Sequence, residues 1–138
     1  GSADEWAAKL REWEDRRPDS PGLTAAIRGA MIGLRSSEQL NRDAGILNDK
    51  WKHCVVGFEI ALAVGLPVGE YAAWSKEHQD LTDGELDTSF DEEDYEATVD
   101  GARQAERAQE SEEREGICEE QWGDRSAPWD GMRPRSNG

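Results

Sequence analysis

The sequence predicts an all-α fold, an irregular bundle of about five helices followed by a flexible C-terminal tail. Apolar residues recur at helical spacing over most of the chain, and Gly- and Pro-containing turns separate these stretches at Pro18–Gly22 and Gly65–Pro67. No segment alternates polar and apolar residues as a strand would. We expect residues 1–122 to form one helical domain and residues 123–138 to be mobile unless Trp129 anchors them.

Two helices are expected in the first third of the chain. The first ends before Pro18, because a proline disfavours helical backbone in the residue that precedes it. Its apolar face is formed by Trp6, Leu10 and Trp13. The second helix has an apolar stripe and two glycines four residues apart, which would let another helix approach closely. The stripe is Leu23, Ile27, Ala30, Met31 and Leu34, and the glycines are Gly29 and Gly33.

A third helical region is expected to open at Ser37–Leu40 and to include Ile46, Leu47 and Trp51. Its second half is apolar nearly all round, which predicts a buried central helix. Gly65 marks its end, because a glycine readily adopts the left-handed backbone found just after many helices.

The remaining helices are expected in the second half of the chain. A fourth begins near Val68, and a fifth turns Tyr95, Val99 and Ala102 inward. After the fifth helix the apolar stripe fades, and Ile117–Trp122 is expected to form at most a short docking helix.

The formal charge of −15 is concentrated in one segment. Residues 79–120 hold 17 acidic and 3 basic side chains, a net charge of −14. Such a field repels phosphate backbones, so we do not expect nucleic-acid binding. It favours a cation or a basic protein partner, and the alternative is a solvated face that serves only solubility or salt tolerance.

Neither the apolar stretches nor the cysteines determine the cellular location of the protein. The longest apolar stretch, Cys54–Gly69, is interrupted by Glu59 and is shorter than the roughly 20 residues of a membrane span. We therefore expect a soluble chain, with exported, periplasmic and cytoplasmic locations all open. Cys54 and Cys118 could pair or be two buried thiols, and the sequence slightly favours two thiols.

Few residues could carry chemistry. The sequence has no phosphate-binding glycine loop, no dinucleotide fingerprint, no zinc-type Cys/His spacing and no GxSxG motif. The catalytic candidates are His53, Glu77 and Asp94, because a histidine that faces carboxylates can act as a general base or hold a divalent ion. The alternative is structural: a histidine beside a tryptophan is usually half-buried, and a lone Glu59 usually pairs with a basic side chain. No cofactor is expected, and a divalent cation stays open.

Part of this polar set follows a known pattern. The run Asn48–Cys54, then Ala61 and Gly65, then Lys76-Glu77 and the stretch 94–101, resembles a helical domain of unknown activity in bacterial proteins. That domain occurs among exported or toxin-associated chains, including Rhs-type C-terminal regions. The resemblance covers residues 48–103 and implies an all-α fold in a bacterial, exported setting.

The pattern is only partly kept. The positions that match the family are His53, Glu77, Asp94 and Gly101. The positions that depart from it are Lys76 and Glu96, where the family has histidines, and Ala97-Thr98, where it has two asparagines. These departures imply that this copy has lost whatever chemistry the family's polar set performs.

The sequence favours a binding protein over an enzyme. The first hypothesis is an inhibitor-, immunity- or adaptor-like protein that presents a negative face to a basic protein partner. The alternative is a divalent-metal-dependent hydrolase or effector-like domain that uses the three catalytic candidates. The residues expected to bind the partner are Asp83, Glu85, Asp87, Asp91, Glu92, Glu93, Glu96 and Asp100.

Overall fold

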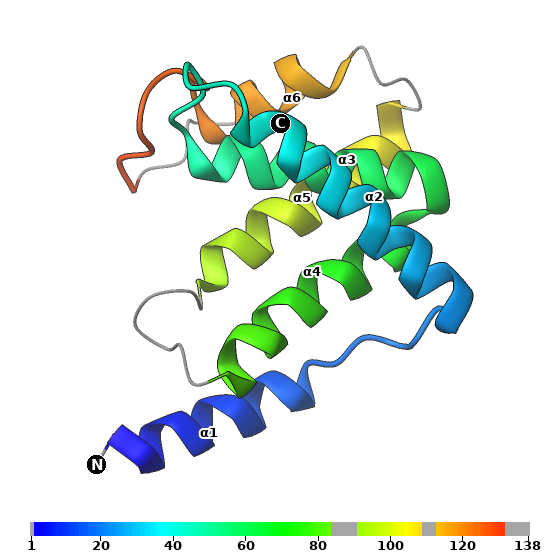
Figure 1. Ribbon diagram of the computed structural model, residues 1–138, viewed down its shortest axis with the longest axis vertical. Coiled ribbons are helices and arrows are strands. Elements are labelled where there is room, and N and C mark those ends of the chain that lie inside the picture. The colour runs from blue at the N-terminus through cyan, green and yellow to red at the C-terminus, as the bar shows by residue number, and fades with distance from the viewer. Residues whose placement is uncertain (1, 84–90, 109–112, 132–138) are drawn as a thin grey trace.

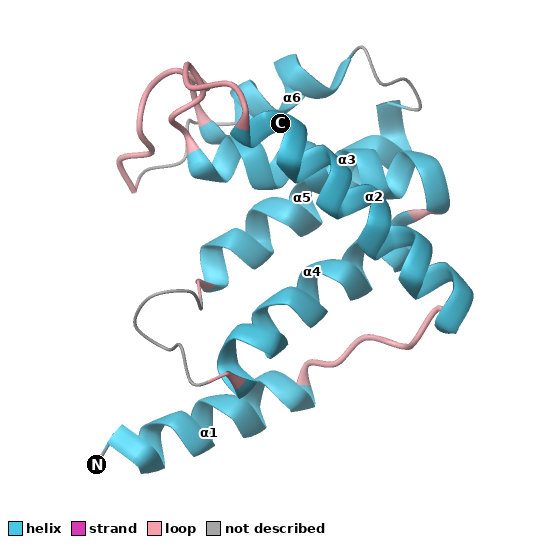
Figure 2. Cartoon of the chain, in the orientation of Figure 1, coloured by secondary structure: helices cyan, strands magenta, loops and turns pink. Residues whose placement is uncertain are grey.

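The computed structural model describes residues 2–83, 91–108 and 113–131, and this part of the chain is all helical (Figures 1 and 2), as the sequence predicts. None of the described helices is both long and apolar enough to cross a membrane. The described helices are α1 (Ser2–Asp15), α2 (Leu23–Asn41), α3 (Asp49–Val64), α4 (Leu66–Thr82), α5 (Glu92–Ala108) and the short docking helix α6 (Arg114–Trp122).

Helix α3 is the centre of the bundle and contacts α2, α4, α5 and α6. It is buried along most of its length, which confirms the predicted central helix. It begins later than predicted, because Ser37–Leu40 belongs to α2 and Ile46 and Leu47 lie in the connection between the two helices. The start of α3 is fixed by Asn48, whose side chain accepts a hydrogen bond of 3.0 Å from the Trp51 amide.

Helix α1 is attached to α4 through indole groups. The Trp13 indole donates to the Trp74 carbonyl at 3.1 Å, and the Trp74 indole donates back to the Trp13 carbonyl at 2.8 Å. Both side chains are fully buried, so their N–H groups need these partners. The Trp6 indole adds a third bond, to the Leu81 carbonyl at 2.6 Å.

The two glycines of α2 face the interior, as their spacing predicts. A Cβ atom at Gly29 would lie 2.4 Å from Val68 of α4, and one at Gly33 would lie 3.0 Å from Ile60 of α3. The apolar stripe of α2, in contrast, faces outward. An amphipathic helix usually turns its stripe toward the core, but here the glycine face has taken that place. The exposed members are Leu23 at 78%, Ile27 at 49%, Met31 at 56% and Leu34 at 63%.

Helices α3 and α5 cross with their backbones nearly touching. A Cβ atom at Gly57 of α3 would lie 1.9 Å from the Thr98 carbonyl oxygen of α5. A Cβ atom at Gly101 of α5 would lie 1.9 Å from the Cys54 carbonyl oxygen of α3. Each helix thus places one glycine against the backbone of the other, and only a residue without a side chain fits at either position.

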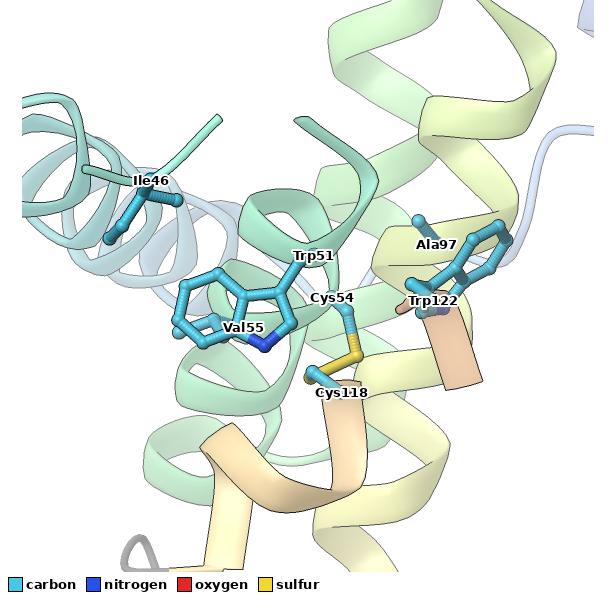
Figure 3. Packing of buried hydrophobic residues seen from close by; sticks show 7 residues of the cluster. All are labelled: Ile46, Trp51, Cys54, Val55, Ala97, Cys118 and Trp122. Atoms are coloured by element: carbon cyan, nitrogen blue, oxygen red, sulfur yellow. A yellow bond between two sulfur atoms is a disulfide. The ribbon is translucent and has the colours of Figure 1, made fainter. Parts of the chain in front are cut away.

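Helix α6 is joined to α3 by a disulfide between Cys54 and Cys118 (Figure 3), with a Cα–Cα distance of 5.7 Å. The expectation of two buried thiols is therefore wrong. The physical reason is the docking of α6: Trp122 is buried in the same cluster as Trp51 and Val55, and this packing brings the two cysteines together. The sequence contains both cysteines but does not show that their helices meet.

The chain after α6 returns to the start of α3. The Arg125 carbonyl accepts from the amides of Leu47 at 2.7 Å and Asn48 at 3.0 Å. The Trp129 ring packs 6.1 Å from that of Trp122. Residues 123–131, expected to be mobile unless anchored, are thus held against the core, and the rest of the expected tail, 132–138, lies outside the described residues.

Candidate functional site

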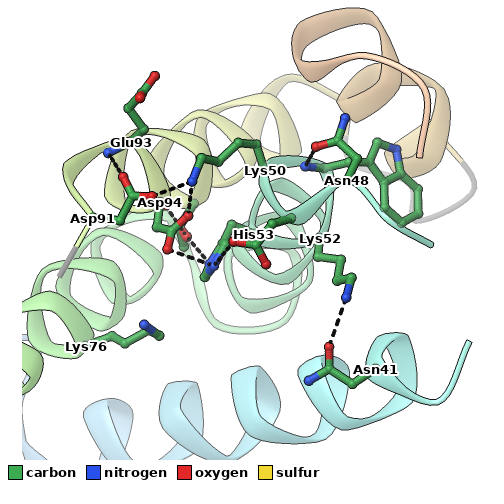
Figure 4. A network of polar contacts seen from close by, with 12 residues as sticks. Asn41, Asn48, Lys50, Lys52, His53, Lys76, Asp91, Glu93 and Asp94 are labelled. Atoms are coloured by element: carbon green, nitrogen blue, oxygen red, sulfur yellow. Dashed lines mark hydrogen bonds and ion pairs between the residues drawn. The ribbon is translucent and has the colours of Figure 1, made fainter. Parts of the chain in front are cut away.

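A cluster of charged side chains lies where the N-terminal ends of α3 and α5 meet (Figure 4). Lys50 lies in the first turn of α3, His53 follows one turn later, and Asp94 lies in the first turn of α5. The close crossing of the two helices at Gly57 and Gly101 brings these three side chains together. The structure therefore joins two of the three catalytic candidates, His53 and Asp94, and adds a lysine.

Lys50 is a buried cation between two carboxylates. Its side chain is only 7% exposed, and its Nζ lies 2.5 Å from Asp91 Oδ2 and 2.6 Å from Asp94 Oδ1. Burial alone would lower the pKa of Lys50, but the hydrogen bonds and charges of the two carboxylates raise it above its ordinary value. The lysine is therefore charged at neutral pH and offsets part of the negative charge at the start of α5.

His53 faces carboxylates with one ring nitrogen and a hydroxyl group with the other. Its Nε2 lies 3.3 Å from Asp94 Oδ2 and 3.7 Å from Asp49 Oδ2. Its Nδ1 lies 3.5 Å from Thr98 Oγ1. The ring is half-buried and open on the side of Asp49, whose side chain is 62% exposed.

Glu77 of α4 does not join His53 among the contacts of the described residues. Its buried carboxylate accepts from the Asp91 amide at 3.0 Å, and its other oxygen lies 3.4 Å from Lys76 Nζ. Burial raises the pKa of Glu77 against the opposing effects of this amide and of Lys76, and the negative charge of Asp94 raises it further. Glu77 thus anchors the start of α5 instead of completing a set with His53 and Asp94.

Asp94 is expected to make the metal-free protein lose stability in acid. Burial opposes its ionisation, but hydrogen bonds and charges from His53 and Lys50 outweigh burial and hold the pKa of Asp94 at about 2. An unfolded aspartate has a pKa of about 3.9, so the unfolded state takes up this proton first. Ionised Asp94 therefore adds about 2 kcal/mol to the free energy of unfolding above about pH 5, and this stabilisation is lost as the pH falls toward 2.

Glu77 has the opposite effect on the pH dependence of stability, because its pKa is raised in the folded state. Its contribution to stability is present in acid and is lost as the pH rises, so it offsets part of the pH dependence that Asp94 causes. Urea unfolding of wild type and Asp94→Asn from about pH 7 to about pH 2.5 measures the Asp94 part. We expect the two proteins to differ most at neutral pH and to converge in acid. A difference that does not change with pH would contradict this account.

The eight acidic residues expected to bind a partner do not all face solvent. Asp91 contacts Lys50, and Asp100 accepts from an indole of α6. Glu92 pairs with Lys9 of α1 and with Arg16, which follows that helix. The exposed ones are Asp83, Glu93 and Glu96, while Glu85 and Asp87 lie outside the described residues.

Two other polar residues have structural roles, and for Glu59 this is the role that the alternative interpretation predicted. Glu59 forms an ion pair with Arg114 of α6. His78 lies 3.2 Å from Glu14 of α1 and stacks on the Trp74 ring at 4.5 Å. Neither contributes to the cluster around His53.

Sequence reasoning missed Asp49, Lys50 and Thr98 as members of this site. A signal was present in the helical spacing: Lys50 lies four and seven residues before Cys54 and Gly57, on one face of α3. This spacing shows that the Lys50 face of α3 packs against α5 only when it is known that Gly57 contacts the α5 backbone.

Comparison of the chain with family models, curated proteins and solved structures gives no match. The resemblance over residues 48–103 therefore stays a prediction. The residues that carry it lie together in the fold: His53 contacts Asp94, Gly101 forms the helix crossing, and Glu77 anchors the same end of α5.

Proposed function

We propose that this chain is a protein-binding domain, of the inhibitor, immunity or adaptor kind, that presents an acidic surface to a basic protein partner. One observation carries the proposal: six exposed carboxylates on or beside α5 and α6 make no ion pair within the described part of the chain. We call them the outer carboxylates, and they are Glu93, Glu96, Glu106, Glu113, Glu119 and Glu120.

The contrast with the inner carboxylates supports this proposal. Asp91 and Asp94 both pair with Lys50, a cation of the same chain. The outer carboxylates lack such a cation in the described residues, so a partner with a basic surface would supply the missing charge. Complementary charge of this kind raises association rates and selects partners more than it raises affinity.

The outward stripe of α2 supports protein binding by a second route. Leu23, Ile27, Met31 and Leu34 follow one another along one face of the helix and are all about half exposed or more. Contiguous exposed apolar patches on soluble domains commonly mark interaction sites. Removal of this stripe from water would supply affinity that surface charge does not supply.

The disulfide supports an oxidising location. Cys54 and Cys118 are both fully buried and paired. Disulfides persist in exported and periplasmic proteins and are rare in the reducing cytoplasm. We therefore favour an exported or periplasmic setting among the locations that the sequence leaves open.

Capture of a partner from the native host tests the proposed function. The immobilised wild-type chain is compared with a variant in which Glu93, Glu96, Glu119 and Glu120 are each replaced by glutamine. We expect the wild type to retain a basic protein at about 50 mM KCl and to release it at about 0.5 M KCl, because salt screens surface charge. The surface variant is expected to retain much less of it.

The matched control removes the same number of charges elsewhere. Its four changes are Glu5→Gln, Asp15→Asn, Asp19→Asn and Glu38→Gln, all at exposed positions outside α5 and α6. This control is expected to bind as the wild type does. Equal retention by all three proteins, or retention that does not depend on salt, would contradict the proposal that the outer carboxylates bind the partner.

A metal-dependent hydrolase is the second candidate function. The contact between His53 and Asp94 favours it, since a histidine and a carboxylate that share a site can hold an ion or move a proton. Glu77 is committed to the Asp91 amide, so any such site would take its third group from Asp49. This candidate requires a bound divalent ion and loses its basis if none binds.

A further inference from the structure

We propose that Asp49, His53 and Asp94 bind one divalent transition-metal ion of the zinc class. Each residue offers one ligand atom, and the three atoms lie within 4.8 Å of one another. Two of the separations are 3.3 Å, between His53 Nε2 and Asp94 Oδ2, and 3.7 Å, between His53 Nε2 and Asp49 Oδ2. Ligands bound to Zn²⁺ at about 2.0 Å in tetrahedral geometry lie about 3.3 Å apart.

The hydroxyl group of Thr98 lies beside the ring nitrogen of His53 that does not face the carboxylates. Thr98 Oγ1 donates its hydrogen to the Asp94 carbonyl at 2.8 Å, so toward His53 Nδ1, at 3.5 Å, it can only accept. In a metal-bound ring this contact suits a proton on Nδ1, which leaves the lone pair of Nε2 for the ion. Nε2 faces the carboxylates of Asp49 and Asp94, and a metal-bound histidine commonly has a hydrogen-bond partner on its other ring nitrogen.

The neighbouring groups leave the required atoms available. Lys50 contacts Oδ1 of Asp94, so Oδ2 stays directed at His53. Asp49 is exposed, so an ion can enter from solvent and keep water in its remaining positions. The positive charge of Lys50 opposes a cation nearby, so we expect a weaker affinity than that of a buried structural zinc site.

The ligand types select among ions. Imidazole nitrogen suits Zn²⁺, Co²⁺ and Ni²⁺, whereas Mg²⁺ and Ca²⁺ prefer sites made of oxygen alone. A site with one histidine and two carboxylates should therefore prefer the first group. Protein binding by the outer carboxylates does not depend on this site, so the two proposals can fail separately.

Titration of ZnCl2 into the EDTA-dialysed full chain tests the proposal, by calorimetry and by thermal unfolding in about 150 mM KCl. We expect one ion per chain and a rise in Tm on the order of 5–10 °C at 100 times the Kd. MgCl2 at the same concentration should leave the Tm unchanged. Zinc binding that does not saturate at one equivalent, or an equal shift with MgCl2, would overturn the proposal.

Three variants locate the ion. Asp49→Ala and His53→Gln are each expected to weaken Zn²⁺ binding at least about ten-fold. His78→Gln is the matched control, because His78 contacts one carboxylate, that of Glu14, and is expected to bind as the wild type does. Asp49 is exposed, so its replacement does not disturb the core. Unchanged binding in Asp49→Ala and His53→Gln, or loss of binding in His78→Gln, would place the ion elsewhere and refute the site.

Discussion

Replacement of Gly57 or Gly101 by alanine is expected to destabilise the protein more than alanine at any other glycine of the described helices. At either position the new Cβ would lie 1.9 Å from a carbonyl oxygen of the facing helix. Neither backbone can move away without separating α3 from α5. Overpacking against adaptable side chains already costs about 1–3 kcal/mol, so contact with backbone should cost at least about 3 kcal/mol.

Urea unfolding followed by circular dichroism measures this loss, with Gly116→Ala as the matched control. Gly116 lies in α6, and an added methyl group there would meet no atom within 4 Å beyond the neighbouring residues and the local helix backbone. Alanine there should therefore be neutral or stabilise the protein by about 0.5–1 kcal/mol. The same chemical change is thus expected to destabilise the protein at the helix crossing but not at Gly116. Gly57→Ala and Gly101→Ala proteins with wild-type midpoints would show that α3 and α5 do not cross as described.

Loss of the Cys54–Cys118 disulfide is expected to have the second largest effect. The bond links residues 64 apart in the sequence. Closure of a loop of this length restricts the unfolded chain by about 4 kcal/mol in the chain-entropy model. Without the bond, α6 is held to α3 by the packing of Trp122 and Cys118 in their shared cluster. We therefore expect α6 of the reduced protein to separate from α3 before the rest of the bundle unfolds.

Urea unfolding with and without a reductant, together with the double variant Cys54→Ala/Cys118→Ala, measures the effect of the bond. Hydrogen exchange of the α6 amides reports its location. We expect both reduced and double-variant proteins to unfold at lower urea, with faster exchange concentrated in α6. Equal midpoints for the oxidised and reduced chains would mean that the disulfide does not stabilise this fold.

The helices were predictable from the sequence, because each has a periodic apolar pattern that local spacing reveals. The buried α3 and the inward face of α5 follow from such patterns alone. The direction of the α2 stripe was not predictable in the same way. Either the glycine face with Gly29 and Gly33 or the apolar stripe could pack against the core. The glycine face is buried because it contacts Ile60 and Val68, which belong to other helices.

The site was only partly predictable for the same reason. His53 and Asp94 were identifiable as chemical types, but their contact depends on a helix crossing between residues that are distant in the sequence. The spacing of Lys50 from Cys54 and Gly57 separates it from Lys52 only when the helix crossing is known, yet one lysine is buried and the other lies partly exposed. The disulfide likewise requires knowledge of where α6 docks.

The dependence of the association rate on salt tests the central claim of protein binding through the outer carboxylates most directly. The captured partner is mixed with the wild type, the four-glutamine surface variant and its charge-matched control at several KCl concentrations. We predict that the rate constant falls steeply with salt for the wild type and the control and only weakly for the surface variant. Identical salt dependence in all three proteins would contradict the claim and leave the acidity of α5 and α6 as a solubilising feature.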